Sequence, residues 1–563
     1  MIVGIDLGTT HSLIGHFDES GSRLCPNALG DLLTPSVVSV DDAGHVIIGQ
    51  AARDRMVSHP EASVASFKRW MGTSRETKLG ERSFRPEELS ALILRSLIAD
   101  AEAATGEKVS EAVISVPAYF SDAQRKATRA AGELAGIRVE RLINEPTAAA
   151  LAYGIQEQRD GARFLVFDLG GGTFDVTVLE LFDGVVEVHA SAGDNFLGGE
   201  DFLDALEAAF LADHKLGSHD LSAQQLGQLR RRLELVKREL SQQTETRLNF
   251  SLGERQIDWS ITQDRFHQIV DPLIQRMRAP LERAMRDARV QPEQLDEIVL
   301  VGGASRMPLV SRLIARMFGR LPMRHIHPDQ AIALGACVAA GMKGRDQRLE
   351  EVILTDVCPY TLGTEIGQMD DFGRVQTGIY SPVIHRNSVV PVSREDTFWP
   401  MRDGQRALNL KVYQGESPMV ANNIKLGELE IKLDPKRPRT ESAVKLRFTY
   451  DINGVLQVEA AVMATGEKYE LILEQNPGLL SQEDIRARLA RLEELKIHPR
   501  DKQENLALIA RAERLYEEHI QARAQLQEWI ARFRSILESQ DDMSIREHHR
   551  EFGRALDSLE QMR

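Results

Sequence analysis

Residues 1–10 read MIVGIDLGTT and residues 164–173 read FLVFDLGGGT, and these two segments decide the fold. Each runs an apolar strand into Asp-Leu-Gly and ends in threonine, which predicts an internally duplicated domain. An aspartate at a strand end can aim its carboxylate at hydrated Mg²⁺, and the following glycines let backbone N–H groups approach phosphate oxygens. Either segment alone could equally be a tight turn in a strand pair. Their pairing favours two turns that hold a nucleoside triphosphate between them.

A third apolar strand and one helix carry further residues that could contact a nucleotide. The strand IVLVGG at 298–303 ends in paired glycines. A nucleoside could lie against that backbone, although strand-to-helix packing alone would give the same pattern. The segment LGQLRRRLELVKRELS at 226–241 has an apolar helix face and a polar face, the latter formed by Glu234, Lys237, Arg238 and Ser241. Such a face is usually only solvated, so its spacing alone does not predict binding.

The pattern of apolar residues changes along the chain and predicts a series of domains. Up to about residue 345, strand-like runs alternate with amphipathic helical patterns, which is typical of an α/β domain. A charged stretch and a short apolar run then indicate a linker. Alternation with a period of two follows, with Asn453-Gly454 as a hairpin signal, and the chain ends in helical patterns. The predicted limits are 1–345 for the α/β domain, 346–357 for the linker, 358–476 for an antiparallel β-domain and 477–563 for the helices.

The composition and the missing motifs exclude several classes of protein. The formal charge of −15 argues against a nucleic-acid surface as the main contact with a partner. The N-terminus does not resemble a secretory signal, and the longest weakly polar run, 331–342, is too short to span a bilayer. Three widely separated cysteines, Cys25, Cys337 and Cys358, fit a reducing compartment, so we expect a cytoplasmic protein without a membrane segment. The sequence has no P-loop, G-x-G-x-x-G, H-E-x-x-H or G-x-S-x-G motif.

Six longer segments resemble the seventy-kilodalton heat-shock chaperones, the DnaK-type family, and most closely its short HscC type. They occur in the family's order and spacing: GIDLGTT at 4–10, VISVPAYFSDAQR at 113–125, LINEPTAAALAYG at 142–154, VFDLGGGTFDVTVLE at 166–180, GDNFLGGEDF at 193–202 and VGGASRMP at 301–308. The resemblance extends over nearly the whole chain. It implies an actin-like ATPase domain, which is a duplicated ribonuclease-H-like α/β fold, followed by an antiparallel β-sandwich and a short helical lid.

The resemblance also implies roles for the residues of an ATP cleft. The implied ligands are ATP or ADP with Mg²⁺ and K⁺, the metals lying near Asp6, Asp168 and Asp175. The implied catalytic residues are Lys68, Glu145, Asp168 and Thr173, of which Lys68 would contact the terminal phosphate and orient the attacking water. The implied nucleotide-binding residues are Gly8, Thr9, Thr10, His11, Gly170, Gly171, Gly172, Thr173, Gly198, Gly199, Glu200, Glu234, Lys237, Arg238, Ser241, Gly302, Gly303, Ala304, Arg306 and Asp329.

Two further groups of residues follow from the resemblance. Nucleotide state would be transmitted by Pro117, Arg125, Arg141, Asn144, Glu145 and Asp356, among which Arg141, Asn144 and Asp356 match positions that J-domain co-chaperones engage. Unfolded or extended client peptides would bind the β-domain at Ile366, Phe398, Met401 and Leu408. Apolar residues that alternate along a strand are equally typical of an ordinary core.

The chain departs from the family pattern at several positions. His11 stands where asparagine is usual, Phe196 where histidine is usual, and Thr355 interrupts the leucine run of the linker. Leu408 replaces a valine, so we expect a shallower client pocket. The hairpin segment 242–261 is shorter than in DnaK, which leaves open whether a GrpE-type exchange factor acts on this protein.

The predicted function is an ATP-dependent molecular chaperone in which ATP hydrolysis controls client affinity through the linker. One alternative is an actin-like metabolite kinase, which would share the cleft but have no use for the β-domain. Another is a nucleotide-gated scaffold without useful turnover. The presence of Lys68, Glu145 and Thr173 speaks against the scaffold.

Overall fold

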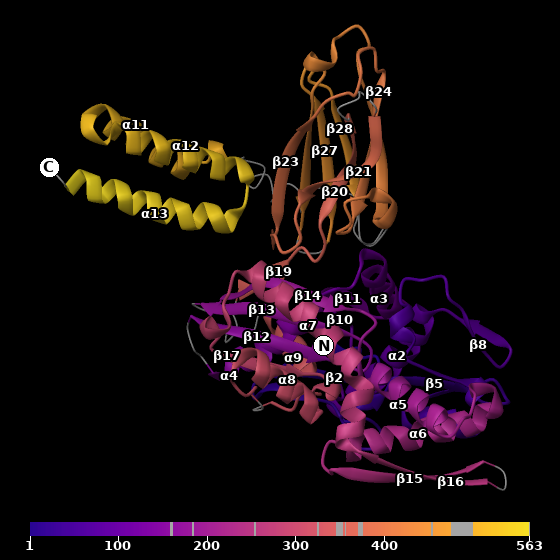
Figure 1. Ribbon diagram of the computed structural model, residues 1–563. Coiled ribbons are helices and arrows are strands. Elements are labelled where there is room, and N and C mark those ends of the chain that lie inside the picture. Colours follow the sequence, from indigo (N-terminus) through magenta and orange to yellow (C-terminus); the bar gives the residue numbers. More distant parts are fainter. Residues whose placement is uncertain are drawn as a thin grey trace. The chain divides into compact units, whose positions relative to one another are not determined.

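The structure is a computed structural model (Figure 1) and divides into two compact units, Met1–Pro359 and Tyr360–Arg563. It describes residues 1–157, 161–182, 185–252, 255–323, 326–344, 353–354, 356–369, 375–451, 454–473 and 499–561. The predicted hairpin turn at Asn453, the charged part of the linker and Thr355 lie outside these residues.

Two mixed β-sheets form the centre of the first unit. The first has the order β11(Arg138–Asn144), β10(Glu111–Val116), β1(Ile2–Asp6), β2(His11–Asp18) and β3(Gly21–Leu24), with β4(Thr34–Pro35) beside β2. The second has the order β17(Glu297–Val301), β12(Ala162–Leu169), β13(Phe174–Phe182), β14(Val185–Asp194) and β18(Ile353–Leu354). The apolar strands predicted within 1–10, 164–173 and 298–303 are confirmed as β1, β12 and β17.

The two sheets repeat one topology. β1 pairs antiparallel with β2 and parallel with β10, and β12 pairs antiparallel with β13 and parallel with β17. In each sheet, the turn after the first strand of the meander carries the Asp-Leu-Gly segment. The predicted duplication is therefore confirmed, and it places two equivalent turns in the two halves of the unit.

Helices cover both sheets and fill the space between them. The helices are α1(Gln50–Ser58), α2(Pro86–Thr105), α3(Asp122–Leu134), α4(Glu145–Glu157), α5(Gly199–Asp213), α6(Ala223–Glu239), α7(Gln263–Ala288), α8(Pro308–Phe318) and α9(Ala331–Lys343). A Cβ on Gly335 of α9 would lie 1.6 Å from the Ala148 oxygen of α4, so the two backbones touch. The weakly polar run at 331–342 is thus a buried central helix, and its small residues permit this close packing.

Smaller elements complete the first unit. They are the sheet β6(Val46–Ile48), β5(Val37–Val40) and β7(Ser63–Ala65), the hairpins β8(Thr77–Leu79) with β9(Arg82–Phe84) and β15(Glu245–Leu252) with β16(Arg255–Thr262), and the 3₁₀ helix η2(Phe67–Trp70). The β15–β16 hairpin runs beneath α6 in the view of Figure 1. The predicted apolar face of α6 packs inward through Leu229, Leu233 and Val236, with Leu240 at the helix end.

Part of the predicted linker is an edge strand of the second sheet. Ile353 and Leu354 form β18, which pairs in parallel with Val185 and Val186 of β14. β19(Asp356–Val357) follows directly. Ladder hydrogen bonds of this kind can be made or released without disturbing the rest of a sheet, because an edge strand has one neighbour only.

The second unit begins with an antiparallel β-sandwich. One sheet has the order β21(Val375–Ile384), β20(Leu362–Met369), β24(Ala407–Gln414) and β25(Ile424–Lys432), and the other has the order β23(Val392–Phe398), β26(Val444–Tyr450), β27(Leu456–Val462) and β28(Lys468–Leu473). β22(Val389–Val390) precedes β23. The predicted alternation is confirmed, since Leu410 and Val412 on β24 and Leu446 and Phe448 on β26 are buried.

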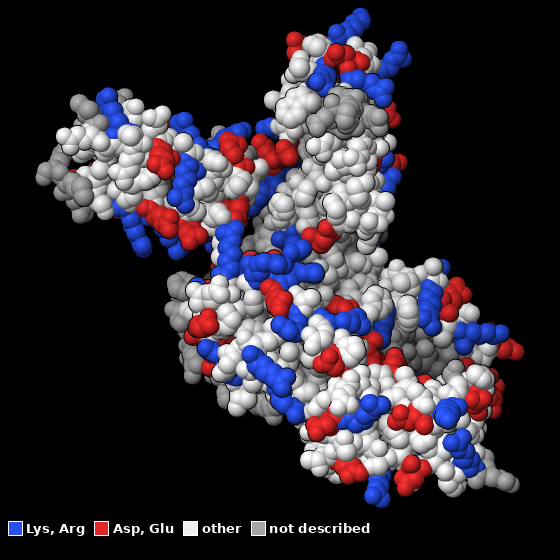
Figure 2. Space-filling view, viewed as in Figure 1, with Lys and Arg blue, Asp and Glu red and all other residues white. Residues whose placement is uncertain are grey.

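The described part of the chain ends in the helices α11(Gln503–Glu518), α12(Arg523–Ser539) and α13(Asp542–Gln561), and the predicted helical residues 477–498 lie outside it. An apolar face of α12 forms the core of these helices, where Leu526, Phe533 and Leu537 are buried. Ion pairs join the helices on the outside, as between Arg511 of α11 and Glu560 of α13, and Figure 2 shows basic and acidic side chains side by side there. Among the described residues, no helix combines the length and the apolar character needed to cross a bilayer.

Candidate active site

The two Asp-Leu-Gly turns face each other across a cavity of about 780 Å³ in the first unit. A Cβ on Gly171 would lie 2.3 Å from Cγ2 of Thr10, so the two turns touch at this point beside the cavity. Most of the predicted nucleotide-binding residues line this cavity, and so do the four predicted catalytic residues. Gly172 and Gly198 do not line it but pack directly behind, since a Cβ on Gly198 would lie 2.5 Å from the Gly172 nitrogen.

Buried carboxylates gather beneath the turns. Asp6 ends β1, and Asp168 and Asp175 are paired across β12 and β13. Burial and the nearby Glu145 carboxylate raise the pKa of Asp6 to about 7 and that of Asp175 to about 8. Burial, Glu145 and Asp175 also raise the pKa of Asp168 well above its usual value. A cation bound among these carboxyls would favour their ionised forms and lower the pKa values again.

The orphaned oxygens of this cluster fit a metal ion. Oδ2 of Asp168 and both carboxylate oxygens of Asp175 have no well-aligned hydrogen-bond donor among the described residues, although the nearby Tyr119 amide lowers the pKa of Asp175 in part. The described residues hold no ready-made cluster of three or more metal-ligating side chains. Mg²⁺ commonly takes one or two carboxylates and completes its shell with water and phosphate oxygens, so the donor set suits Mg²⁺ bound with a nucleotide.

One lysine lies among these acids. Lys68 of η2 donates to Oε1 of Glu145 at 2.8 Å, and both side chains are buried. Glu145 begins α4, directly after the strand β11. Ser115 of β10 donates to Oδ1 of Asp6 at 3.0 Å and holds that carboxylate toward the cavity wall. Three segments far apart in the sequence thus meet at the phosphate end of the cavity.

The raised pKa values predict a pH-dependent stability of the nucleotide-free, metal-free protein. Since folded Asp6 and Asp175 keep their protons up to about pH 7 and 8 and the unfolded carboxyls lose them near pH 4, stability should fall as pH rises through this window. Asp175→Asn should flatten the fall, whereas Asp42→Asn, at an exposed aspartate, should not. Thermal unfolding in EDTA from pH 6 to pH 8 measures this, and parallel curves for all three proteins would contradict it.

The other end of the cavity suits a nucleoside. Lys237 of α6 donates to the Gly199 oxygen at 2.8 Å and pairs with Glu234 at 2.7 Å. Burial opposes ionisation of Glu234, but Lys237 and Arg238 outweigh it and lower the pKa. Gly302, with φ of 79°, lets the backbone after β17 approach Leu169, where a Cβ would lie 2.4 Å from the Leu169 oxygen.

Two arginines stand at this end with their side chains more than half exposed. Arg306 pairs with Asp329 at 3.3 Å, and Arg238 pairs with Glu234 at 2.8 Å. Guanidinium groups stack on aromatic rings, so both side chains can contact a purine. Ser241 and Ala304 complete this part of the lining.

His11 is neutral in this structure. Arg53 donates to its Nε2 at 3.0 Å, which leaves Nδ1, 3.3 Å from the Thr10 hydroxyl, to carry the proton. Burial and the Arg53 guanidinium lower the pKa of His11 to about 4. The histidine thus acts as a hydrogen-bonding group at ordinary pH, as an asparagine would.

The predicted coupling residues are brought together only in part. Arg125 donates to Oδ1 of Asn144 at 2.7 Å and to the Ala118 oxygen at 3.1 Å, and Asn144 directly precedes Glu145. Pro117 follows β10 at the start of the same loop, and Arg141 lies on β11 away from the cavity lining. Asp356 lies on β19, and its side chain lies outside what the structure describes.

The predicted client residues lie on both sheets of the sandwich. Ile366 is on β20 and Leu408 on the neighbouring β24, Phe398 ends β23 in the other sheet, and Met401 follows in the connection to β24. All four are partly buried. The sandwich thus leaves each partly accessible without defining one groove.

Three polar residues of the site were missed by sequence reasoning. Arg53 lines the cavity beside His11, Ser115 holds Asp6, and Arg69 pairs with Asp201 while packing on Gly172. Ser115 and Asp201 lie in segments that resemble the family, and Arg69 directly follows the implied catalytic Lys68, so each had a usable signal. Arg53 is a charged residue on a mostly polar helix, and nothing in its neighbourhood indicates a role.

Comparison with known proteins decides the family. A family model described as Hsp70 protein matches residues 2–80 and 74–563. The chain belongs to the Hsp70 family. Chaperone protein DnaK of Thermotoga neapolitana is 40% identical over 504 residues, which cover 86% of this chain and 82% of that protein. Chaperone protein DnaK of Thermosipho africanus is 39% identical over 497 residues, covering 86% and 81%.

Membership in the Hsp70 family fixes the broad function. The chain is an ATP-dependent molecular chaperone and an ATPase, and its nucleotide is ATP or ADP with Mg²⁺. The predicted fold class, an actin-like ATPase domain followed by a β-sandwich and a helical lid, is confirmed. Neither a metabolite kinase nor a scaffold without turnover is supported.

Proposed function

We propose that the cavity of the first unit binds ATP with its phosphates between the two Asp-Leu-Gly turns. The turn at Thr9 and Thr10 and the turn at 170–173 supply backbone N–H groups from opposite sides, and Gly198 and Gly199 close the site from behind. The adenosine lies at the end formed by Gly302 and Gly303, with Arg238 and Arg306 beside the base. The observation that carries this proposal is the contact of the two turns above a cluster of buried, partly orphaned carboxylates.

The residues beneath the turns supply positioning and charge neutralisation, which is most of what phosphoryl transfer needs. Mg²⁺ near Asp6, Asp168 and Asp175 would neutralise phosphate charge. We propose that K⁺ also binds near these three carboxylates. The ammonium group of Lys68, which Glu145 orients, lies beside the terminal phosphate in this proposal. Thr173 presents its hydroxyl from the opposite turn. Water attacks the terminal phosphorus, the bond to ADP breaks, and phosphate leaves.

Coupling to the rest of the chain runs through β11 and the linker in this proposal. Glu145 touches the chemistry through Lys68, and its neighbour Asn144 is hydrogen-bonded to Arg125. The same edge carries Arg141. A J-domain co-chaperone would engage Arg141, Asn144 and Asp356 and favour the geometry that hydrolyses ATP, while the linker strand β18 transmits the nucleotide state. An exchange factor of the GrpE type stays an open question.

Clients are unfolded or extended apolar peptide segments, bound by the β-sandwich near Ile366, Phe398, Met401 and Leu408. We propose as domain limits 1–345 for the ATPase domain, 346–357 for the linker, 358–476 for the sandwich and 477–563 for the lid, in a cytoplasmic protein. Assignment to the short HscC type stays a prediction.

The client site gives a testable prediction at Leu408. Because leucine fills more of the central pocket than valine, we expect fast peptide release in ADP. Leu408→Val should slow the release of leucine-rich peptides several-fold, which is about the effect of burying one additional methylene group of the peptide. Val412→Ala, a change on the same strand at a fully buried position, serves as a control for general loosening of the sandwich. Release of a fluorescent peptide measures this. An unchanged rate of peptide release in Leu408→Val would show that Leu408 does not line the client pocket.

A single-turnover ATP assay with and without an apolar peptide tests the function as a whole. Peptide should raise the hydrolysis rate, because the client and the nucleotide act on one linker. A rate that peptide leaves unchanged, in a protein that binds both ligands, would refute the coupling.

A further inference from the structure

A pair of aromatic side chains outside the cavity lining joins the two halves of the first unit. The rings of Trp70, at the end of η2, and Phe196, in the loop before α5, have their centroids 6.2 Å apart with an angle of 54° between them. Such tilted contacts are favourable for aromatic pairs. The two residues remain 38% and 50% exposed, so the contact lies at the surface and is not part of a core.

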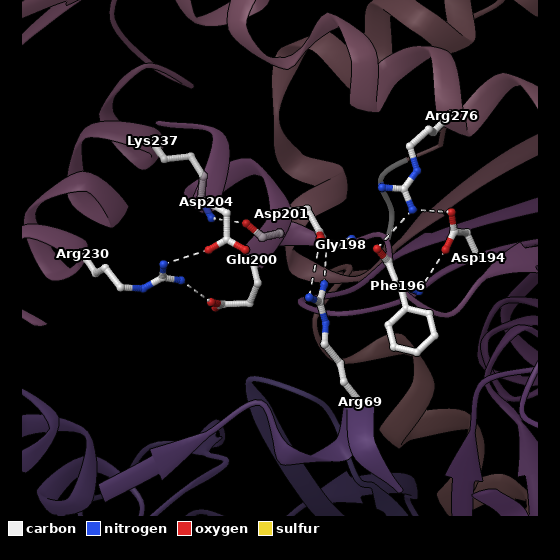
Figure 3. Close-up of polar contacts among 11 residues, drawn as sticks. Arg69, Asp194, Phe196, Gly198, Glu200, Asp201, Asp204, Arg230, Lys237 and Arg276 are labelled. Carbon is white, nitrogen blue, oxygen red and sulfur yellow. Dashed lines mark hydrogen bonds and ion pairs between the residues drawn. The ribbon is translucent and has the colours of Figure 1, made fainter. Parts of the chain in front are cut away.

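Phe196 is held in place by its own loop. Its N–H donates to Oδ1 of Asp194 at 2.9 Å, and its oxygen accepts from Arg276 of α7 at 3.2 Å. Arg276 also binds Asp194 at 2.6 Å, so one guanidinium fixes both ends of the turn (Figure 3). These hydrogen bonds fix the backbone of the loop that carries the ring.

The loop that carries Phe196 is tied to the phosphate turn of the second sheet. The amides of Gly199 and Glu200 donate to the oxygens of Gly170 and Gly171, each at 2.9 Å. Gly198 packs against Gly172. A displacement of Phe196 would therefore also displace the turn at 170–173, which faces the terminal phosphate.

The opposite side of the contact belongs to the helix that carries Lys68. Trp70 lies two residues after Lys68, its ring is covered by the Arg75 guanidinium at 4.3 Å, and its oxygen accepts from the Thr73 hydroxyl at 2.7 Å. Arg69, between them, makes a forked ion pair with Asp201 of α5 (Figure 3). Both residues after Lys68 thus bind the other half of the ATPase domain.

We propose that Trp70 and Phe196 form an aromatic clasp that positions Lys68 against the phosphate turn and slows the release of ADP. The clasp can form only when the two halves of the domain close, so it favours the closed state by its own contact free energy. Phe196 departs from the family's usual histidine, so the clasp belongs to this chain. Trp70 and Phe196 are positioning residues that act through Lys68 and the turn at 170–173. The inference rests on the proposed ATP site.

A double-mutant cycle on full-length protein tests the clasp, with dissociation of a fluorescent ADP analogue in Mg²⁺ as the measurement. We expect Trp70→Ala and Phe196→Ala each to speed release roughly two- to tenfold, the range that aromatic pairs contribute. The double variant should be no faster than the faster single variant, because either change removes the same contact. Single-turnover hydrolysis should slow in the same variants.

Conservative and distant variants separate positioning from general loosening. Trp70→Phe should restore slow release, Phe196→His should give an intermediate rate, and Leu29→Ala, at an exposed leucine of the first half, should leave release unchanged. Unchanged release in both single variants, or effects that multiply fully in the double variant, would overturn the clasp. Failure of the ATP site itself would look different, because the wild-type protein would then bind no analogue.

Discussion

Lys68→Ala should slow single-turnover ATP hydrolysis about a hundredfold, because loss of one positioned electrostatic donor costs roughly 3 kcal/mol of barrier. Lys68 is the cation placed within 2.8 Å of Glu145 at the phosphate end of the cavity. ATP binding should change far less, since the adenosine contacts lie at the other end. Rapid-mixing assays with enzyme in excess separate the hydrolysis step from nucleotide binding.

Two further variants show whether the loss of hydrolysis is specific to Lys68. Thr173→Ala should have an effect of the same kind from the opposite turn, whereas Lys78→Ala, at an exposed lysine of β8, should hydrolyse ATP normally. Removing Lys68 also leaves Glu145 buried among like charges, so the nucleotide-free variant should unfold at a lower temperature. A hydrolysis rate in Lys68→Ala equal to that of the wild-type protein would show that Lys68 takes no part in hydrolysis.

Asp356→Asn should abolish the acceleration of peptide release by ATP and the stimulation of hydrolysis by a J-domain protein. The residue begins β19, two positions after the last residue of the edge strand β18, whose pairing with β14 joins the linker to the second sheet. A charge-assisted contact made only while the linker is docked would favour that state, and its loss returns the protein to the undocked state. Basal hydrolysis should stay nearly unchanged, because the cavity lining is intact.

A backbone variant tests the strand itself. Leu354→Pro fixes φ and crowds the preceding residue, which disfavours the pairing of β18 with β14, so it should slow ATP-triggered release about tenfold or more. Asp434→Asn, at an exposed carboxylate of the sandwich, serves as the matched control. ATP-triggered peptide release at the wild-type rate in both linker variants would show that the linker does not control client affinity.

Local pattern was enough to predict the elements, and their pairing predicted the duplication. The run at 164–167 is buried on both sides as a central strand, and the apolar face of α12 forms the core of the helical part. The catalytic assignments came from the resemblance, because the side chains of Lys68 and Glu145 meet only in the folded chain, 77 residues apart. On sequence alone Lys68 is a surface lysine.

Other features depend on contacts that no local pattern carries. The tautomer of His11 is set by Arg53 on a different element, and the contact of Trp70 with Phe196 joins two segments whose neighbours in sequence show no aromatic pattern. Pairing of Ile353 and Leu354 with β14 is equally non-local. The client groove is the least determined, since its four predicted residues are spread over two sheets and a connection.

Hydrogen exchange of the linker tests most directly the central claim that nucleotide state controls the chaperone through β18. Amides of Ile353 and Leu354, and of their partners Val185 and Val186, should be followed in ADP and in ATP, with Lys68→Ala used to hold the ATP state. We predict slow exchange in ATP, where the strand pairs with β14, and fast exchange in ADP. Equal exchange in the two states would contradict the account, because the linker would then carry no information from the cleft to the client site.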